Sequence, residues 1–426
     1  MSGGRAKARS DEVRMKRLVL SLAALPCFTC SSPDVAGGEA TAGRVGGLWV
    51  ETAPLDEMML EFIAAHDVPG ASLAISDAGE VVYSRGFGFA SLSSMERVRP
   101  ESLFRIASIS KPITAVAVMQ LVERGALSLD ENPFEVIGFG GLLGGAGCDE
   151  RLKQVSVRQL LAHRGGWDRD VSYDPMFQTL RIQEELGLSG IPTTRDIIRF
   201  MLSEPLDFDP GERYAYSNFG YCVLGRVIEA VTGKPYDEAV RERVLAPLGV
   251  EGMRIGRSLP EDRVEGEVAY HDQEKRAREP VKARGRRVPI GYAHDQEVMD
   301  SHGAWIASAE DLARFAGAFS DPSSSPLLTE ESVRAMWAPQ QERPKAVWYG
   351  LGWQVRDVGE GRRNAWHSGL LTGGTSTIMV RRHDGLSWAV LFNTDRSGTS
   401  GDRLAGLIDP LVHRAVNQAK ELLNGR

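Results

Sequence analysis

A serine and a lysine three residues apart are the first residues in this sequence that could do chemistry together. Ser108 and Lys111 lie in the segment 104–115, at the start of an apolar stretch with helical spacing. In a helix, side chains three positions apart lie on one side, within hydrogen-bonding reach. Burial and the positive end of the helix dipole would lower the pKa of the lysine, so that its amine could take the serine proton. Alone the pair is weak, since Ser-x-x-Lys is expected about once by chance at average residue usage.

A tyrosine and an asparagine form a second cluster. Tyr216 and Asn218 lie two residues apart in the segment 211–220, just before a predicted helix. The tyrosine could act as a base or a proton relay if a nearby ammonium lowers its pKa from about 10. The asparagine amide could hold a substrate carbonyl or the lysine. Taken alone, the segment is explained as well by helix capping.

A third cluster, His367-Ser368-Gly369, precedes the last predicted strand pair. A polar residue followed by glycine on a sheet edge would let a substrate acyl group lie along the strand. The N–H groups of Ser108 and Leu370 would then be two hydrogen-bond donors for a developing oxyanion. We therefore assign Ser368, Gly369 and Leu370, with the Ser108 N–H, to substrate and oxyanion binding. A glycine-rich hairpin loop is the alternative for this segment.

Together, Ser-x-x-Lys, Tyr-x-Asn and His-x-Gly resemble, in this order and at these spacings, the three signature motifs of serine β-lactamases and penicillin-binding proteins. Three more segments are similar to that family. They are Leu-Leu-x-His-x-x-Gly at 160–166, a small-residue turn with an Asp-Leu helix at 305–315, and a Tyr-Gly-Leu-Gly-Trp strand at 349–353. The resemblance covers the chain from about residue 50 to its end, and it implies a chemistry that needs no metal and no cofactor.

The resemblance also implies the role of each site residue. Ser108 would be the nucleophile of an acyl-enzyme mechanism, with Lys111 and Tyr216 moving its proton. Asn218 would position Lys111 and the substrate, and His367 would support the proton network of Tyr216. The expected function is a serine hydrolase acting on a small ester or amide, namely a D-Ala peptide, a short-chain ester or a β-lactam. The alternative is a penicillin-binding sensor that is acylated without turnover.

The third motif departs from that of class C β-lactamases, which carry Lys-Thr-Gly. A lysine there is a permanent cation, whereas histidine, with a pKa near 6.5, is largely neutral at pH 7. His367 therefore predicts a weaker grip on an anionic β-lactam.

The predicted elements form an α+β fold of the β-lactamase/transpeptidase type. Strand pairs with glycine-containing turns are expected at 71–86 and 375–393. A helix at 55–66 precedes the first pair, and a helix at 402–423, interrupted near Pro410, follows the second. Further helices are expected at 111–124, 157–162, 194–202, 218–231 and 236–245. This order predicts an antiparallel sheet built from both chain ends, flanked by helices, with an inserted mainly helical lobe at about 125–290.

The amino-acid composition limits the classes of binding partner that we expect. The 426 residues are 42% hydrophobic and carry a formal net charge of −7, so there is no basic excess to hold nucleic acid. We expect a small-molecule or peptide substrate, and the sequence does not specify an oligomeric state. The densely charged segment 261–287 is predicted to be a solvated loop.

The N-terminal segment predicts export. Basic residues precede an apolar run at 18–25, which is too short to span a membrane and is typical of a secretory signal. We assign 1–30 to this signal, 31–48 to a flexible tether and 49–426 to the hydrolase domain, with a periplasmic or secreted location. A membrane tether through a lipid on Cys27 or Cys30 is the alternative. Cys148 and Cys222 could pair or remain free thiols.

Overall fold

The structure is a computed structural model, and it describes residues 44–45, 48–49, 52–145, 147–341 and 345–424. Residues 42–426 form one compact unit. The predicted signal at 1–30, Cys27 and Cys30 lie outside the described residues, as does most of the predicted tether. None of the helices within the described ranges combines the length and the apolar character that a membrane crossing requires.

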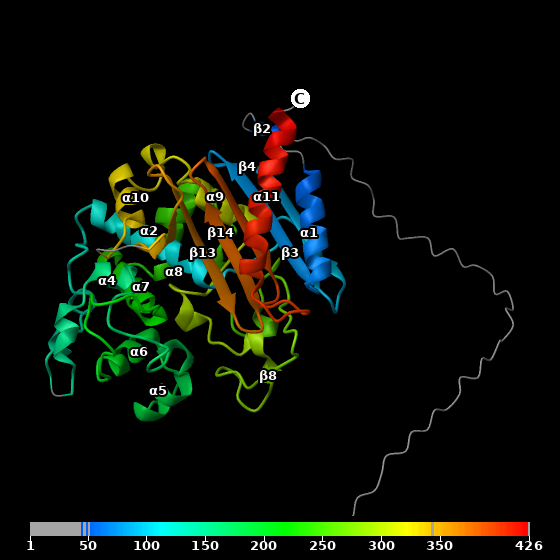
Figure 1. Cartoon of the computed structure of the whole chain (residues 1–426). Coiled ribbons are helices and arrows are strands. Elements are labelled where there is room, and N and C mark those ends of the chain that lie inside the picture. The colour runs from blue at the N-terminus through cyan, green and yellow to red at the C-terminus, as the bar shows by residue number, and fades with distance from the viewer. Residues whose placement is uncertain (1–43, 46–47, 50–51, 146, 342–344, 425–426) are drawn as a thin grey trace, which may run out of the picture. The chain divides into compact units, whose positions relative to one another are not determined.

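An eight-stranded antiparallel sheet runs through the molecule, and both chain ends contribute to it, as predicted (Figure 1). The C-terminal strand of the second hairpin pairs with the first strand of the N-terminal hairpin, from Leu386 opposite Asp77 to Phe392 opposite Ala71. The strand order is β11 (Val347–Tyr349), β12 (Gln354–Asp357), β13 (Arg363–Leu371), β14 (Thr375–Arg381), β15 (Leu386–Phe392), β3 (Gly70–Asp77), β4 (Glu80–Ser91) and β5 (Glu96–Arg97).

Turn chemistry fixes two of the connections. Ala78 and Gly79 both have positive φ, 49° and 90°, which is the backbone of a two-residue turn matched to the twist of antiparallel strands. The segment 349–353, expected to be one strand, is instead largely a turn between β11 and β12. Gly352 has φ 89°, and the Gly350 N–H donates to the Trp353 carbonyl at 2.8 Å. Two glycines in five residues favour a chain reversal over a strand.

Helices cover both faces of the sheet. One face packs on α1 (Ala53–Ala65) and α11 (Leu404–Asn424), which contact each other, and forms its own apolar core. The other face packs on α9 (Ala309–Gly317) and belongs to the larger core, to which α2 (Ser110–Glu123) also contributes. Figure 1 shows α1 and α11 on one side of the sheet and the helical lobe on the other.

The last helix is continuous, so the predicted interruption near Pro410 is wrong. Proline removes one N–H donor from a helix. Here the residues on both sides of it, including Leu404, Ile408, Val412 and Val416, are buried in one apolar core against the sheet. That burial offsets the lost hydrogen bond, because tertiary packing provides most of the stability of a helix in a protein.

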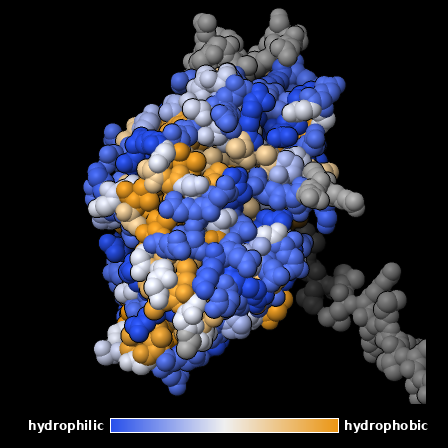
Figure 2. Space-filling model, turned by 90° about the vertical axis from the view of Figure 1, so that its left-hand side faces the viewer, coloured by the Kyte–Doolittle hydropathy of each residue, from blue (hydrophilic) through white to orange (hydrophobic). Residues whose placement is uncertain are grey.

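The inserted lobe is helical from α3 to α8, and the helices predicted from the sequence are confirmed. On the side of the molecule shown in Figure 2, hydrophobic residues gather in a band that runs down a face that is otherwise mainly hydrophilic. The segment 254–289 is different, because each of its strands within the described residues is two residues long. The predicted loop at 261–287 has exposed positions along its length, but Glu267, Val268 and Tyr270 in it are buried. The lobe helices are α3 (Pro133–Val136), α4 (Val157–Leu161), α5 (Thr179–Glu185), α6 (Thr194–Met201), α7 (Asn218–Thr232) and α8 (Tyr236–Val240), the last continued by a π-helical turn, Arg241–Leu245.

Candidate active site

A strained turn carries Ser108 to the start of α2. Ser108 is half-buried in a 3₁₀ turn, Ala107–Ile109, and Ala107 before it has φ 46°, a left-handed conformation that costs a non-glycine residue energy. The sheet fixes this turn directly. The Thr377 hydroxyl of β14 donates to the Ile106 carbonyl at 3.0 Å. A Cβ on Gly369 of β13 would lie 2.2 Å from that same carbonyl oxygen, so only glycine permits this approach.

Lys111 is fully buried, and its amine has three oxygen neighbours. Nζ lies 2.8 Å from Asn218 Oδ1, 2.9 Å from the His302 carbonyl and 3.1 Å from Ser108 Oγ. Burial holds the pKa of Lys111 well below its ordinary value, and the charge of Arg169 lowers it further. A neutral amine has two N–H donors and one lone pair. The amide and carbonyl oxygens can only accept, so the lone pair is left for the Ser108 hydroxyl.

Tyr216 approaches Ser108 from the other side. Its hydroxyl lies 2.8 Å from Ser108 Oγ and donates to it, because the serine proton faces Lys111. Burial raises the pKa of Tyr216, against the lowering that the sequence suggested; the hydrogen bond to Ser108 and the charge of Arg169 oppose this only in part. Burial also disfavours the charged form of Lys111, so the ammonium that would have lowered the pKa of Tyr216 is itself destabilised. Tyr216 is therefore a neutral proton donor in the resting site.

Asn218 is held in place by a carboxylate that the sequence did not single out. Its Nδ2 donates to Asp174 Oδ2 at 2.6 Å, which fixes the amide so that Oδ1 faces Lys111. Ser217 takes the capping role at the start of α7, where its hydroxyl accepts from the Gly220 N–H at 3.3 Å. Asn218 is thus free to point into the site. Asp174 also caps the 3₁₀ turn Pro175–Phe177, where its side chain accepts from the Met176 N–H at 3.2 Å. The local sequence therefore indicates capping, and only the fold reveals the contact with Asn218.

His367 has different partners from those expected. Its Nδ1 lies 2.8 Å from the Ser368 carbonyl, so that nitrogen carries the proton, and Nε2 accepts from the Tyr349 hydroxyl at 3.0 Å. The rings of Tyr349 and His163 stand between His367 and Tyr216. Burial lowers the pKa of His367 to about 3. The predicted support of Tyr216 by His367 is therefore not a direct hydrogen bond.

The open edge of β13 lies beside the nucleophile. β12 pairs with β13 only as far as Trp366, and β13 packs against the turn that holds Ser108. Across the described part of the chain, the Ser108 N–H has no hydrogen-bond acceptor. Leu370 follows Gly369 on this edge. The arrangement suits a carbonyl oxygen placed between the N–H groups of Ser108 and Leu370.

The sequence and fold of this chain are similar to those of known proteins. The model of the family described as Beta-lactamase matches residues 55–412. The chain belongs to the Beta-lactamase family. It is 30% identical over 388 residues to Esterase EstB of Burkholderia gladioli, covering 85% of this chain and 95% of that protein. It is 26% identical to Penicillin-binding protein 4* of Bacillus subtilis (strain 168), covering 75% and 66%. A D-stereospecific amidohydrolase from Streptomyces sp. superposes with a TM-score of 0.63 at 25% identity, covering 85% and 98%.

In this Beta-lactamase family chain, the side chain of Ser368 points away from the Ser108 cluster. Alternate burial along β13 places His367 and Gly369 on the Ser108 side and Ser368 and Leu370 on the α11 side. There they line a cavity of about 690 Å³ with Arg356, Trp366, Arg403 and His413. Binding of substrate by the Ser368 hydroxyl stays a prediction.

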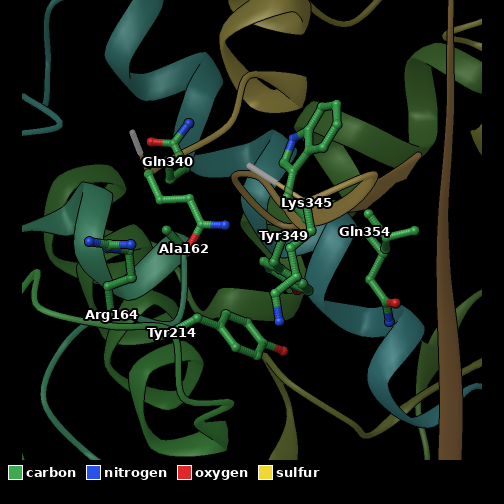
Figure 3. Close-up of a pocket in the computed structure, with 10 residues that line it drawn as sticks. Ala162, Arg164, Tyr214, Gln340, Lys345, Tyr349 and Gln354 are labelled. Atoms are coloured by element: carbon green, nitrogen blue, oxygen red, sulfur yellow. The ribbon is translucent and has the colours of Figure 1, made fainter. Parts of the chain in front are cut away.

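A second cavity, of about 460 Å³, lies beside Tyr214 and Tyr349, whose rings pack against that of His163 (Figure 3). Tyr349 and Tyr214 both line it, and the Tyr349 hydroxyl also bonds to His367 in the site. Arg164 and Lys345 contribute positive charge to its rim.

A buried tryptophan and the two cysteines whose pairing the sequence left open complete the description of this region. Trp167 is buried against Phe134 and Phe219, at ring-centroid distances of 6.2 and 4.8 Å. Cys148 and Cys222 are both free thiols, and burial raises the pKa of Cys222 to about 12. The described residues contain no group of three His, Cys, Asp or Glu side chains arranged to hold a metal ion.

Proposed function

We propose that this chain is a serine hydrolase that works through an acyl-enzyme on a small ester or amide. One observation carries the proposal: Ser108 Oγ lies between the buried Lys111 amine at 3.1 Å and the buried Tyr216 hydroxyl at 2.8 Å. This is an activated nucleophile with its base already in contact.

Acylation begins when Ser108 Oγ attacks the substrate carbonyl carbon. Its proton passes to the Lys111 amine, which becomes an ammonium held by Asn218 and the His302 carbonyl. The carbonyl oxygen takes the negative charge and is stabilised by the N–H groups of Ser108 and Leu370. Collapse of this intermediate breaks the bond to the leaving group. Tyr216 gives that group its proton and is reprotonated by Lys111, so both residues return to their neutral forms.

Deacylation is the same proton path in reverse. A water molecule attacks the acyl carbon and gives its proton to Lys111 through Tyr216. Ser108 then leaves as its hydroxyl, taking the proton back. The free acid is released and the site is restored. No net proton is gained or lost by the protein in one cycle of acyl transfer.

The relatives support the class of reaction. One is named an esterase and another a D-stereospecific amidohydrolase, and both align with most of this chain. Neutral His367 leaves the third motif without a fixed cation, so this motif by itself offers no positive charge to an anionic β-lactam.

Replacement of the nucleophile tests the proposal. We expect Ser108→Ala to lower kcat/KM for para-nitrophenyl butyrate by at least ~10³-fold. Ser110→Ala, two residues on, is the matched control and should keep most of the activity, because its hydroxyl bonds only to the Ala107 carbonyl. A Ser108→Ala protein with undiminished hydrolysis would refute the assignment.

Turnover distinguishes an enzyme from the alternative, a penicillin-binding sensor. Incubation with a fluorescent penicillin and a fluorophosphonate, followed by intact-mass measurement, reports acylation of Ser108. A stable penicillin adduct together with no hydrolysis of a D-Ala-D-Ala peptide, para-nitrophenyl butyrate or nitrocefin would identify a receptor. Measurable kcat/KM in that panel identifies an enzyme and ranks its substrate classes.

A further inference from the structure

Arg169 lies over the face of the Tyr216 ring, at the mouth of the catalytic cluster. Its guanidinium carbon is 4.7 Å from the centroid of that ring, and the residue is exposed. The Tyr216 hydroxyl is 2.8 Å from Ser108 Oγ. A small substrate acylating Ser108 therefore lies within one side chain's length of the Arg169 charge.

Among the described residues this cation forms no ion pair, although its charge lowers the pKa of Asp168 and of Asp174 from beyond ion-pair distance. Throughout the described ranges, no carboxylate lies within ion-pair distance of the Arg169 guanidinium. The neighbouring Asp168 is already bound to Arg213 at 2.6 Å, and Asp174 is bound to Asn218. An exposed arginine fixed over an aromatic ring and left without a counter-ion is suited to bind a ligand carboxylate through two parallel N–H bonds.

The rest of the cluster cannot take that role. Lys111 is buried, and its amine is engaged by Ser108, Asn218 and the His302 carbonyl. His367 is buried and neutral, since burial lowers its pKa to about 3. Arg169 is thus the remaining cation beside Tyr216.

We propose that Arg169 is a specificity-determining residue that binds a carboxylate of the substrate, so that this hydrolase prefers esters and amides carrying a carboxylate near the scissile bond. The inference rests on the proposed function and adds its substrate class. In place of the cation missing from the third motif, the charge comes from Arg169, in the loop after the segment 160–166 and over the Tyr216 ring.

Two matched substrate pairs test this. The first is para-acetoxybenzoate with para-acetoxybenzamide, which differ by a carboxylate in the leaving group. The second is mono-para-nitrophenyl adipate with its methyl ester, which differ by a carboxylate in the acyl group. In Arg169→Gln, we expect kcat/KM for the anionic member of at least one pair to fall about tenfold, mainly through KM. The neutral members should change by less than about twofold. Arg169→Lys should lie between, because it keeps the charge and loses the planar fork.

Controls separate this from other effects. Arg403→Gln removes the same charge from the cavity beside Ser368, on the other side of the sheet edge, and should leave the anion preference intact. Because Arg169 also lowers the pKa of Lys111, each protein is assayed on the plateau of its own pH profile.

The outcomes are distinct. Equal losses for anionic and neutral members, no loss for either, or loss of the preference in Arg403→Gln would each overturn the proposal. Failure of the proposed function would show instead as no Ser108-dependent hydrolysis of any of the four substrates by the unaltered protein.

Discussion

Lys111 can be a base at neutral pH only because its surroundings disfavour its charged form. It is fully buried, and the largest influence on its pKa is loss of hydration, with the charge of Asp174 opposing and that of Arg169 assisting. The reaction needs the neutral amine. Hydrolysis should therefore be lost as the pH falls through the lowered pKa of Lys111, and that acid limb reports the electrostatics of the site.

A permanent cation at this position should abolish catalysis. Arginine stays protonated at every accessible pH, so Lys111→Arg cannot accept the Ser108 proton. We expect at least a ~10³-fold loss in kcat/KM, similar to removal of the nucleophile. Burst kinetics with para-nitrophenyl butyrate and labelling by a fluorophosphonate would measure it. Retained labelling at the unaltered rate would mean that Lys111 is not the base.

Asp174 is a positioning residue whose loss has a pH signature. In Asp174→Ala, the Asn218 amide loses the acceptor that orients it, and we expect kcat to fall about tenfold. The negative charge that raises the pKa of Lys111 is also removed, so the acid limb of the kcat/KM profile should move to lower pH. Exposed Asp170→Ala is the control. A lowered kcat with the acid limb unmoved would contradict the coupling.

At the scale of elements, close backbone contact between β13 and the turn before α2 sets the distance between nucleophile and sheet edge. Gly369→Ala would place a methyl group 2.2 Å from the Ile106 carbonyl oxygen and 2.3 Å from Thr377 Oγ1. The turn must then move away from the edge. We expect at least a ~10²-fold loss in kcat/KM, because displacement of about 1 Å costs that much. Hydrolysis of para-nitrophenyl butyrate measures it.

A second glycine provides the control for that variant. Gly406 lies in α11 with open space where a Cβ would stand, and alanine there should raise the free energy of unfolding by about 0.5–1 kcal/mol. Urea unfolding would measure both proteins. Unchanged activity in Gly369→Ala would show that the contact does not position the nucleophile.

Elements with local signals were the ones predictable from sequence. Both hairpins carry their own turn residues, and the helix at 218–231 has a capping serine and an apolar periodicity, so each could be located without knowledge of its neighbours. The turn at 350–353 and the helix through Pro410 were misjudged. Strand-like composition and a proline are local signals, whereas the strand pairing and core packing that override them come from residues distant in sequence.

The contacts of the site also divide into those that local sequence predicts and those that it does not. Ser108 and Lys111 are near neighbours in the chain, and their contact follows from helix spacing. Asp174 and Tyr349 come from separate segments of the chain. Their local sequence does not indicate that they contact Asn218 and His367, respectively. The motif resemblance predicted that Tyr216 and His367 belong to the same site. It did not predict the hydrogen bonds of His367, because these depend on the Tyr349 ring that lies beside it.

At the scale of the whole molecule, the packed interior contains three buried histidines, for which burial favours the neutral form. His163, His302 and His367 are each about 1% exposed, and burial lowers the pKa of all three. The folded state therefore binds fewer protons than the unfolded chain, in which histidine has a pKa near 6.5. Stability is fully present above that pH and falls as the pH drops below it.

Acid should therefore unfold this protein through its buried histidines. Between pH 7.5 and 5.5, His367 should lower the free energy of unfolding by about 1.4 kcal/mol, and His163 and His302 should add to this loss in the same direction. For His367 the loss continues to its folded pKa of about 3. Urea unfolding at both pH values measures it, and His367→Gln should reduce the difference by about 1.4 kcal/mol. Partly exposed His66→Gln is the control. Equal stability at the two pH values would mean that these rings are protonated inside the fold.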